Sequence, residues 1–455
     1  MPKYDSLYRT GSVWSSILKL SIPALVIILL LTFYNMADMI FIGQLGDSAM
    51  VASVSIVSPL FSLLMAVATM IGFGACTLIT NSFGANDLEQ AKMISSVSFW
   101  AAILFSIVII PILLVLRSPL LYLLGATSET FGYASEYFTI LLLGAPFMIL
   151  STMLASIIRA DGSIKESMIG NIAGTITNLV LDPVFILVLK QGVKGAAIAT
   201  VAGNLLATLI CLYFIFHNNS VSIRLSYAKR KPFIIGTVLA LGLPNAVSTI
   251  LSGFASSFSN NLLKGYGTDA IAAMAAAGKV SMIIGMIILG ITMGTQPLLA
   301  YAYGAKDQKR LRELLKDLIV LTSVLGLSAA GLSYFARTSI IHLFLKTSSA
   351  ASLAESVVLF LIIGAPFTGL VNIATNLMQA AQNAGGAIIL SALRQGILLI
   401  AFLYLFESFF GFTGIAMAHT AADMLSFLIA LGFIYRQLRK INEEILSVKK
   451  KVCIS

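Results

Sequence analysis

The tetrapeptide GAPF occupies residues 144–147 and recurs, letter for letter, at residues 364–367. Other segments repeat at the same spacing of about 220 residues: LSIP at 20–23 with LGLP at 241–244, FGAND at 83–87 with YGAKD at 303–307, and GVKGAAIA at 192–199 with GFTGIAMA at 411–418. A repeat that spans nearly the whole chain predicts two structural halves. We place the halves at residues 1–218 and 233–455, joined by a linker at 219–232.

The composition is typical of a polytopic membrane protein. Of the 455 residues, 58% are hydrophobic and only 11% are charged, which leaves little polar surface for water. The apolar runs are roughly 20 residues long, the length of a transmembrane helix. A bilayer admits only helices or closed barrels, and a barrel would show alternating segments of roughly ten residues instead. The sequence therefore predicts an all-α membrane protein.

Twelve apolar runs are expected to cross the membrane, six in each half. Their approximate spans are 15–42, 50–80, 93–116, 133–158, 168–189, 195–216, 233–262, 271–302, 315–336, 354–380, 388–406 and 412–435. Because six is even, both halves enter the membrane in the same direction. We therefore predict two six-helix bundles related by a pseudo-two-fold axis along the membrane normal, an arrangement common among transporters.

The predicted topology explains where the basic residues behind the net charge of +10 lie. Most of the 29 Lys and Arg residues fall on one side of the predicted spans, and that side is expected to be cytoplasmic. We therefore predict a multi-pass protein of the cell membrane with both termini in the cytoplasm, a lipid bilayer as its environment, and no nucleic-acid partner. We expect a monomer. The three cysteines lack the spacing of a disulfide framework or a metal site, and no cofactor is predicted.

The stretch FYNMADMIFIG, residues 33–43, places Asp38 inside the first run. A charged residue at mid-span costs roughly 2.5–3.5 kcal/mol on insertion scales and marks a candidate functional site. The fifth run adds Asn178 and Asp182 on one helical face, and the sixth adds Thr200. From the helix rise, Asp38, Asp182 and Thr200 lie roughly 7 to 12 Å below the outer surface, with Asn178 one turn deeper. Such a layer of oxygens suits a small monovalent cation or a proton shared by two acids.

Each member of this set also has a structural explanation. Asp38 lies near a helix end and could extend to the surface or bond a neighbour. Asp182 precedes Pro183 and could satisfy backbone groups at a proline kink. Thr200 is of a type that commonly packs between membrane helices. The common depth of the four side chains favours the functional interpretation.

The second half does not repeat these residues, since Ser259 stands opposite Asp38. We expect it to bury Lys279, which either pairs with an acid across a central cavity or extends to the interface. Asn372 and Asn376 share a helical face and either line the cavity or bond neighbouring helices. The candidate cavity-lining residues of the whole chain are Tyr34, Asn35, Lys279, Asn372 and Asn376.

Three further polar residues of the second half are given structural roles. Arg394 is predicted to lie at the interface near a cytoplasmic helix end. His419 and Asp423 are one turn apart and are expected to pair with each other.

Together these segments resemble the multidrug and toxic compound extrusion (MATE) family, in particular its DinF-like bacterial branch. The motifs that carry the resemblance are the proline at 23 with YNMADMIFIG, FGAND, RADGS, NLVLDPVFI and GVKGAAIATVAGN. The resemblance implies a secondary antiporter, not an enzyme, that exports organic, cationic, amphipathic drugs in exchange for Na⁺ or H⁺. It places the cation at Asp38, Asn178, Asp182 and Thr200. It also matches Pro23 to a first-helix proline whose kink the family links to substrate release.

Other functions are weighed against this one. A flippase for a lipid-linked envelope precursor, of the same superfamily, would line its cavity with several Arg or Lys, whereas Lys279 stands nearly alone here. A membrane enzyme would need clustered histidines or acids, and the three histidines are scattered. The residues leave the choice between Na⁺ and H⁺ open.

Overall fold

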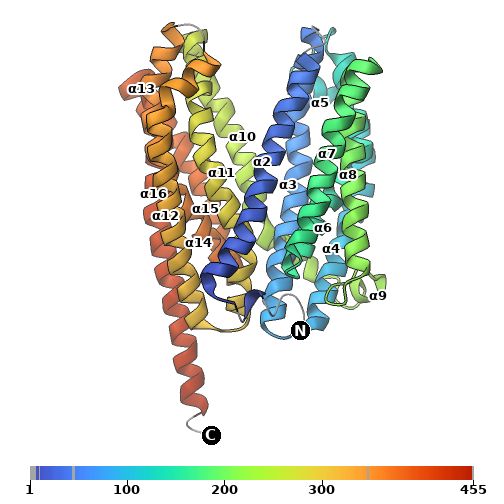
Figure 1. Ribbon diagram of the computed structural model, residues 1–455, viewed down its shortest axis with the longest axis vertical. Coiled ribbons are helices and arrows are strands. Elements are labelled where there is room, and N and C mark those ends of the chain that lie inside the picture. The colour runs from blue at the N-terminus through green and yellow to red at the C-terminus, as the bar shows by residue number, and fades with distance from the viewer. Residues whose placement is uncertain (1–6, 10, 44–46, 346–347, 453–455) are drawn as a thin grey trace. The chain divides into compact units, whose positions relative to one another are not determined.

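The protein is seen in a computed structural model that describes residues 7–9, 11–43, 47–345 and 348–452. Within these ranges it leaves out the side chains of residues 31, 33–40, 42–43, 48, 343–344, 348, 441–442 and 444–452. Every regular element in the described ranges is a helix (Figure 1). The predicted all-α membrane fold is therefore confirmed.

The first half contains six long helices and several short ones. The long helices are α2 (Val13–Gly43), α3 (Ser48–Gly84), α4 (Leu88–Val115), α6 (Phe131–Ala160), α7 (Ile164–Pro183) and α8 (Gly192–Phe216). The short elements are α5 (Arg117–Leu123), the π-helix η1 (Val184–Val188) and, in the linker, α9 (Leu225–Ala228).

The second half follows the same order. Its helices are α10 (Ile234–Leu263), α11 (Thr268–Gly304), α12 (Gln308–Phe344), α13 (Ser348–Gly364), α14 (Thr368–Ala380), α15 (Ala384–Ala392) and α16 (Leu398–Val452). Short 3₁₀ segments, η2 (Lys264–Tyr266) and η3 (Ala365–Phe367), follow α10 and α13. A π-helix, η4 (Leu393–Ile397), joins α15 to α16.

Eleven helices of the described chain are long and apolar enough to cross a membrane, against twelve predicted runs. The difference lies at the end of the chain, where one helical stretch, Ala384–Lys440, contains both of the last predicted runs. Gly411 interrupts this stretch with φ 60° and ψ −136°, a conformation open essentially to glycine alone. The two arms on either side of Gly411 correspond to the predicted runs 388–406 and 412–435.

The repeated GAPF sequence marks the same helix crossing in both halves. A Cβ atom on Gly144 of α6 would overlap the side chain of Val201 on α8. In the second half, a Cβ on Gly364 of α13 would lie 3.0 Å from the Cα of Thr420 on α16. The residue after each glycine, Ala145 or Ala365, belongs to the buried apolar core of its half. Glycine at this position therefore lets two core helices approach closely.

The repeated FGAND and YGAKD sequences form matching turns. Asp87 caps α4 by accepting a 2.9 Å hydrogen bond from the backbone N–H of Gln90, and Asp307 caps α12 through the N–H of Arg310 at 3.0 Å. The residue before each aspartate, Asn86 or Lys306, has a positive φ of 59° or 54°. The repeat in the sequence is thus a repeat of local structure.

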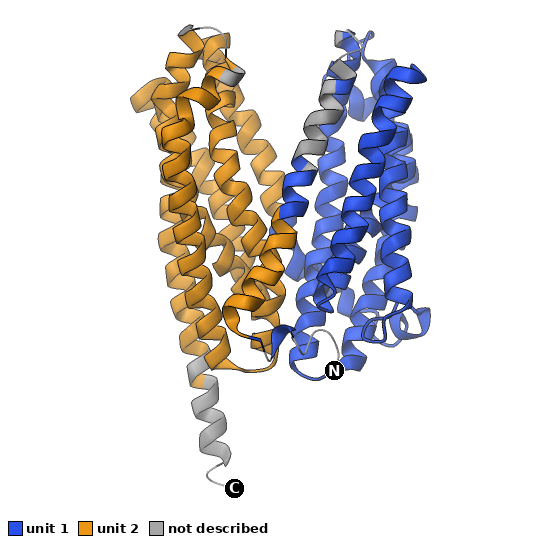
Figure 2. Ribbon diagram, in the orientation of Figure 1, with its two compact units in different colours: residues 1–11, 26–246 blue, residues 12–25, 247–455 orange. Residues whose placement is uncertain are grey.

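The chain forms two compact units that exchange the first parts of two helices (Figure 2). Unit 1 contains residues 1–11 and 26–246, and unit 2 contains residues 12–25 and 247–455. In unit 2, a Cβ on Gly294 of α11 would lie 2.6 Å from the carbonyl oxygen of Leu20 on α2. In unit 1, a Cβ on Gly74 of α3 would overlap the carbonyl of Val238 on α10. The start of α2 therefore packs against α11, and the start of α10 packs against α3.

Each exchanged segment ends just after a proline. Pro23 lies within α2 and Pro244 within α10, and the unit changes after residue 25 and after residue 246. Proline removes one backbone hydrogen bond from a helix and so permits bending there. The two units therefore differ from the two halves predicted from the repeat, 1–218 and 233–455. Unit 1 also contains the start of α10, and unit 2 also contains the start of α2.

Candidate functional site

Three of the four predicted cation ligands lie on α7 and α8, and all three are buried. Asp182 is fully buried, and Asn178 and Thr200 are each 3% exposed. The Nδ2 of Asn178 donates a 3.3 Å hydrogen bond to the Oγ1 of Thr200, which joins the two helices directly. Asp182 lies one turn beyond Asn178 on the same helix. The structure therefore brings Asn178 and Thr200 into direct contact.

A glycine contact holds α7 and α8 close at this level. A Cβ on Gly174 would lie 2.7 Å from the carbonyl oxygen of Gly203, and a Cβ on Gly203 would lie 3.1 Å from the Cβ of Asn178. Any side chain at either glycine would push the helices apart. Close backbone approach through small residues is a common way to pack membrane helices. Here it sets the helix separation that the Asn178–Thr200 hydrogen bond requires.

A polar network extends from Thr200 to α6. The Nδ2 of Asn204 donates to the carbonyl oxygen of Thr200 at 2.9 Å, and the hydroxyl of Ser151 donates to the Oδ1 of Asn204 at 2.9 Å. Sequence reasoning did not place Asn204 or Ser151 in the site. Asn204 could have been found, because it follows Thr200 by one helical turn. Ser151 gives no comparable signal, since it lies in an apolar run without a polar neighbour one turn away.

The donor set at this site is made of oxygens. The Oδ1 of Asn178 is buried and has no hydrogen-bond partner among the described residues, although leaving such an atom unsatisfied costs about 1–3 kcal/mol. The carboxylate of Asp182 and the hydroxyl of Thr200 complete the set. Hard cations such as Na⁺ prefer oxygen ligands of this kind. Within the described residues, no group of three His, Cys, Asp or Glu side chains forms a metal site.

The remaining predicted residues of the first half are in α2. The side chains of Tyr34, Asn35 and Asp38 lie outside the described residues, so their part in the site stays a prediction. The backbone of α2 is helical on both sides of Pro23.

The polar residues of the second half occupy different environments from one another. Lys279 is exposed on α11 and not buried among the helices, because Ala276 and Val280 take the inward positions of this turn. Its expected place, in the cavity or at the interface, stays a prediction. The Nδ2 of Asn376 donates a 2.8 Å hydrogen bond to the carbonyl oxygen of Thr292 on α11. Asn376 therefore bonds a neighbouring helix. Asn372 is half-buried on the same helix, α14.

Arg394 was predicted to lie at the membrane interface, but in the structure it forms an ion pair with another helix. Its Nε donates a 2.8 Å hydrogen bond to the Oδ1 of Asp423 on α16, and the two residues form an ion pair within unit 2. The expected partner of Asp423 was His419, one turn away. The prediction overlooked that η4, which contains Arg394, packs against the later part of α16 and so brings the guanidinium within reach of the carboxylate.

Comparison with known proteins identifies relatives along almost the whole chain. The family model described as MatE matches residues 23–184 and 244–405, so each matched segment begins at one of the two prolines, Pro23 or Pro244. The multidrug export protein MepA of Staphylococcus saprophyticus is 29% identical over 436 residues, which cover 95% of this chain and 96% of that protein. MepA of Staphylococcus aureus shows the same identity and coverage.

Solved structures share the fold. A crystal structure of MATE in complex with MaL6 superimposes with a TM-score of 0.90 at 24% identity, over 97% of this chain and 100% of that one. A structure described as the outward-facing conformation of a multidrug resistance MATE family transporter of the MOP superfamily gives a TM-score of 0.91 at 24% identity, over 96% and 98%. At this identity, the likeness supports the architecture of the chain.

Proposed function

The chain belongs to the MatE family of membrane transporters, and we propose that it exports organic, cationic, amphipathic compounds in exchange for Na⁺ or H⁺. The names of the two MepA relatives support export of several drugs as the activity. A transporter of this kind needs no catalytic residues, since it moves its substrate without chemical change.

The observation that carries the coupling proposal is the buried oxygen set at Asn178, Asp182 and Thr200. A carboxylate at full burial is unfavourable unless a counter-charge or a proton neutralises it. Na⁺ would be held by the Asp182 carboxylate with the free Oδ1 of Asn178 and the Oγ1 of Thr200. A proton would instead bind the Asp182 carboxylate alone. In both cases, Asp38 is the expected second acid.

Coupling requires that cation and substrate favour different states of the transporter. Neutralising Asp182 and Asp38 removes the attraction that these acids exert on a cationic substrate. It also alters the packing of α2, which carries Asp38 and bends most readily at Pro23. We propose that cation binding in the first half therefore favours substrate release.

Transport assays in liposomes test this function. The full chain is reconstituted, a cationic rhodamine ester is used as substrate, and the Na⁺ gradient and the pH gradient are imposed separately. We expect dye export to follow at least one gradient and to be lost in Asp182→Asn. Dye movement that is independent of both gradients would indicate a passive pathway, and the absence of dye movement would contradict the proposed export.

A further inference from the structure

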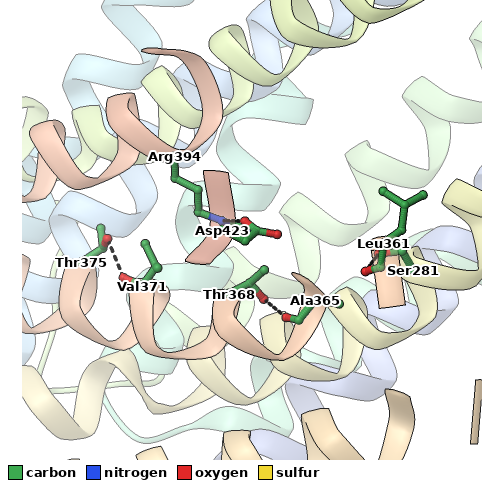
Figure 3. Close-up of polar contacts among 8 residues, drawn as sticks. All are labelled: Ser281, Leu361, Ala365, Thr368, Val371, Thr375, Arg394 and Asp423. Atoms are coloured by element: carbon green, nitrogen blue, oxygen red, sulfur yellow. Dashed lines mark hydrogen bonds and ion pairs between the residues drawn. The ribbon is translucent and has the colours of Figure 1, made fainter. Parts of the chain in front are cut away.

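An ion pair lies within unit 2, whereas the described residues of the candidate cation site belong to unit 1. The Nε of Arg394, in the π-helix η4, is 2.8 Å from the Oδ1 of Asp423 on α16, and the two side chains are 18% and 19% exposed. Figure 3 shows the two side chains pointing toward one another, close to the junction of α13 and α14 at Ala365 and Thr368. Neither the cation site nor the proposed coupling uses this pair.

The pair lies far from the ends of its helices. At about 1.5 Å per residue, Arg394 is about 15 Å along the helix from Ala384, and Asp423 is about 18 Å from Gly411. A charged side chain at such depth in a membrane helix is costly and usually marks a functional site. This depth also places the pair beyond the level of lipid headgroups, which makes a lipid phosphate an unsuitable partner.

Arg394 uses only part of its hydrogen-bonding capacity. Among the described residues, its one hydrogen bond is that from Nε to Asp423. The two terminal nitrogens have no protein acceptor in that part of the chain, and the side chain as a whole is partly exposed. A guanidinium is planar and always charged, and its paired N–H groups match the two oxygens of a carboxylate. The geometry is therefore that of a half-occupied anion site.

Aromatic side chains border the ion pair. Phe427 lies one turn beyond Asp423 on α16, and its ring packs edge-on against Phe367 of η3, with ring centroids 5.2 Å apart. Gly364 brings α13 close to the same turn, since a Cβ there would lie 3.4 Å from the Oδ2 of Asp423. An apolar, aromatic surface thus lies one helical turn from the carboxylate end of the ion pair. A ligand with a ring system and an acidic group would contact both.

The first half packs its corresponding helices without such a pair. At the repeat spacing of about 220 residues, Arg394 stands where the first half has Gly174, and Asp423 stands where it has Asn204. The first half joins its helices at this level through the Gly174–Gly203 contact. The second half instead has a guanidinium in a π-helical turn, and such turns are frequent at functional sites.

We propose that Arg394 binds the carboxylate of amphipathic substrates that carry an acidic group, zwitterions above all. The substrate carboxylate takes the terminal nitrogens, while Asp423 holds Nε and so fixes the orientation of the guanidinium. This inference rests on the proposed export function and assigns the substrate class of the C-terminal unit. It is distinct from cation coupling, which uses the acids of the first half.

Binding of two matched dyes to the purified full chain tests the proposal. Rhodamine 110 carries a free carboxylate, and rhodamine 123 is its methyl ester; fluorescence polarisation gives the Kd of each. We expect Arg394→Gln to weaken the binding of rhodamine 110 by about tenfold or more, because the variant loses charged hydrogen bonds to the carboxylate. The Kd of rhodamine 123 should stay within about twofold of the wild-type value. Asp423→Asn should retain or tighten the binding of rhodamine 110, because the amide oxygen can still accept from Nε while a competing negative charge is removed.

The controls separate binding from folding. The double variant Arg394→Gln/Asp423→Asn replaces the ion pair by two neutral amides and avoids an unpaired buried acid. It should show the same selective loss of rhodamine 110, with a melting temperature near that of the wild type. Equal losses of both dyes, or a loss of rhodamine 110 in Asp423→Asn, would show that the pair only clamps the helices together.

Different results would refute the proposed export function and the proposed carboxylate site. If the wild-type protein binds the ester but not the acid, the carboxylate site is refuted and export of cationic compounds stands. If it binds neither dye and exports no ester from liposomes, both are refuted.

Discussion

Asp182 and Asn178 are two buried polar side chains that lie one helical turn apart on α7, within an otherwise apolar bundle. Asp182 is fully buried, and the Nδ2 of Asn178 is engaged by Thr200 while its Oδ1 has no partner among the described residues. The first residue supplies charge and the second supplies a neutral oxygen. Substitutions here should change ion coupling more than folding.

Asp182→Asn should abolish cation-dependent export of a cationic dye, because the remaining ligands carry no negative charge. Asparagine keeps the shape of the side chain and removes the cost of burying a charge, so the variant should remain folded and inserted. His419→Ala, in the second half, is the matched control and should keep substantial transport. The measurement is dye export from liposomes under a Na⁺ or pH gradient. Equal losses in both variants would mean that the second half contributes a titrating site.

Asp38→Asn should likewise abolish export while the protein remains folded and inserted. The reason is its expected place as the second acid beside the α7–α8 oxygens. Resistance of cells to a cationic drug reports the activity, and membrane abundance of the variant reports folding. Normal resistance in cells that express Asp38→Asn would exclude this residue from coupling.

At the scale of elements, glycines decide which helices meet. Gly144 and Gly364 mark the same crossing in the two halves, and Gly174 with Gly203 brings α7 against α8. The repeat of GAPF made the first correspondence predictable. The Gly174–Gly203 contact was not predictable from one sequence, because it depends on the rotation of two helices about their axes.

Gly174→Ala should separate α7 from α8, because the added methyl group would lie 2.7 Å from the carbonyl of Gly203. We expect a loss of about 1–3 kcal/mol in stability, as for overpacked cores, and weaker cation dependence of transport. Gly331→Ala in α12 is the matched control, since no atom lies within 4 Å of the added Cβ. Thermal unfolding in detergent measures the stability of each. Similar melting temperatures for the two variants would contradict the role of the crossing.

The elements were largely predictable, and the polar pairs between them were not. The length and spacing of apolar runs predicted the helices, and Gly411 accounts for the last two runs appearing as one interrupted stretch. Depth along each helix suggested a common polar layer for Asn178, Asp182 and Thr200, but it did not give the hydrogen bond between Asn178 and Thr200. By contrast, the pairing of Arg394 with Asp423 depends on contacts between helices, which periodicity does not encode. Sequence position alone placed Arg394 at an interface.

At the scale of the whole molecule, cation and substrate are expected to be linked. If cation binding weakens the binding of a cationic drug, bound drug must weaken cation binding by the same factor. We predict that drug affinity of the purified protein falls along a Na⁺ titration at fixed pH, or along a fall in pH without Na⁺. The fall should disappear in Asp182→Asn. Affinity that stays flat in both wild-type titrations would make the α7–α8 oxygens a structural network.

The exchange of helical segments has a consequence for the order in which the protein is made. Residues 12–25 leave the ribosome well before α11 does, yet they pack against Gly290 and Gly294 of that helix. At synthesis rates of about 5–20 residues per second, the partner surface follows on the order of tens of seconds later. During that interval, the start of α2 lacks its native neighbour and must be accommodated by lipid or by the insertion machinery. A nascent chain halted within the linker 219–232 would therefore contain neither compact unit complete.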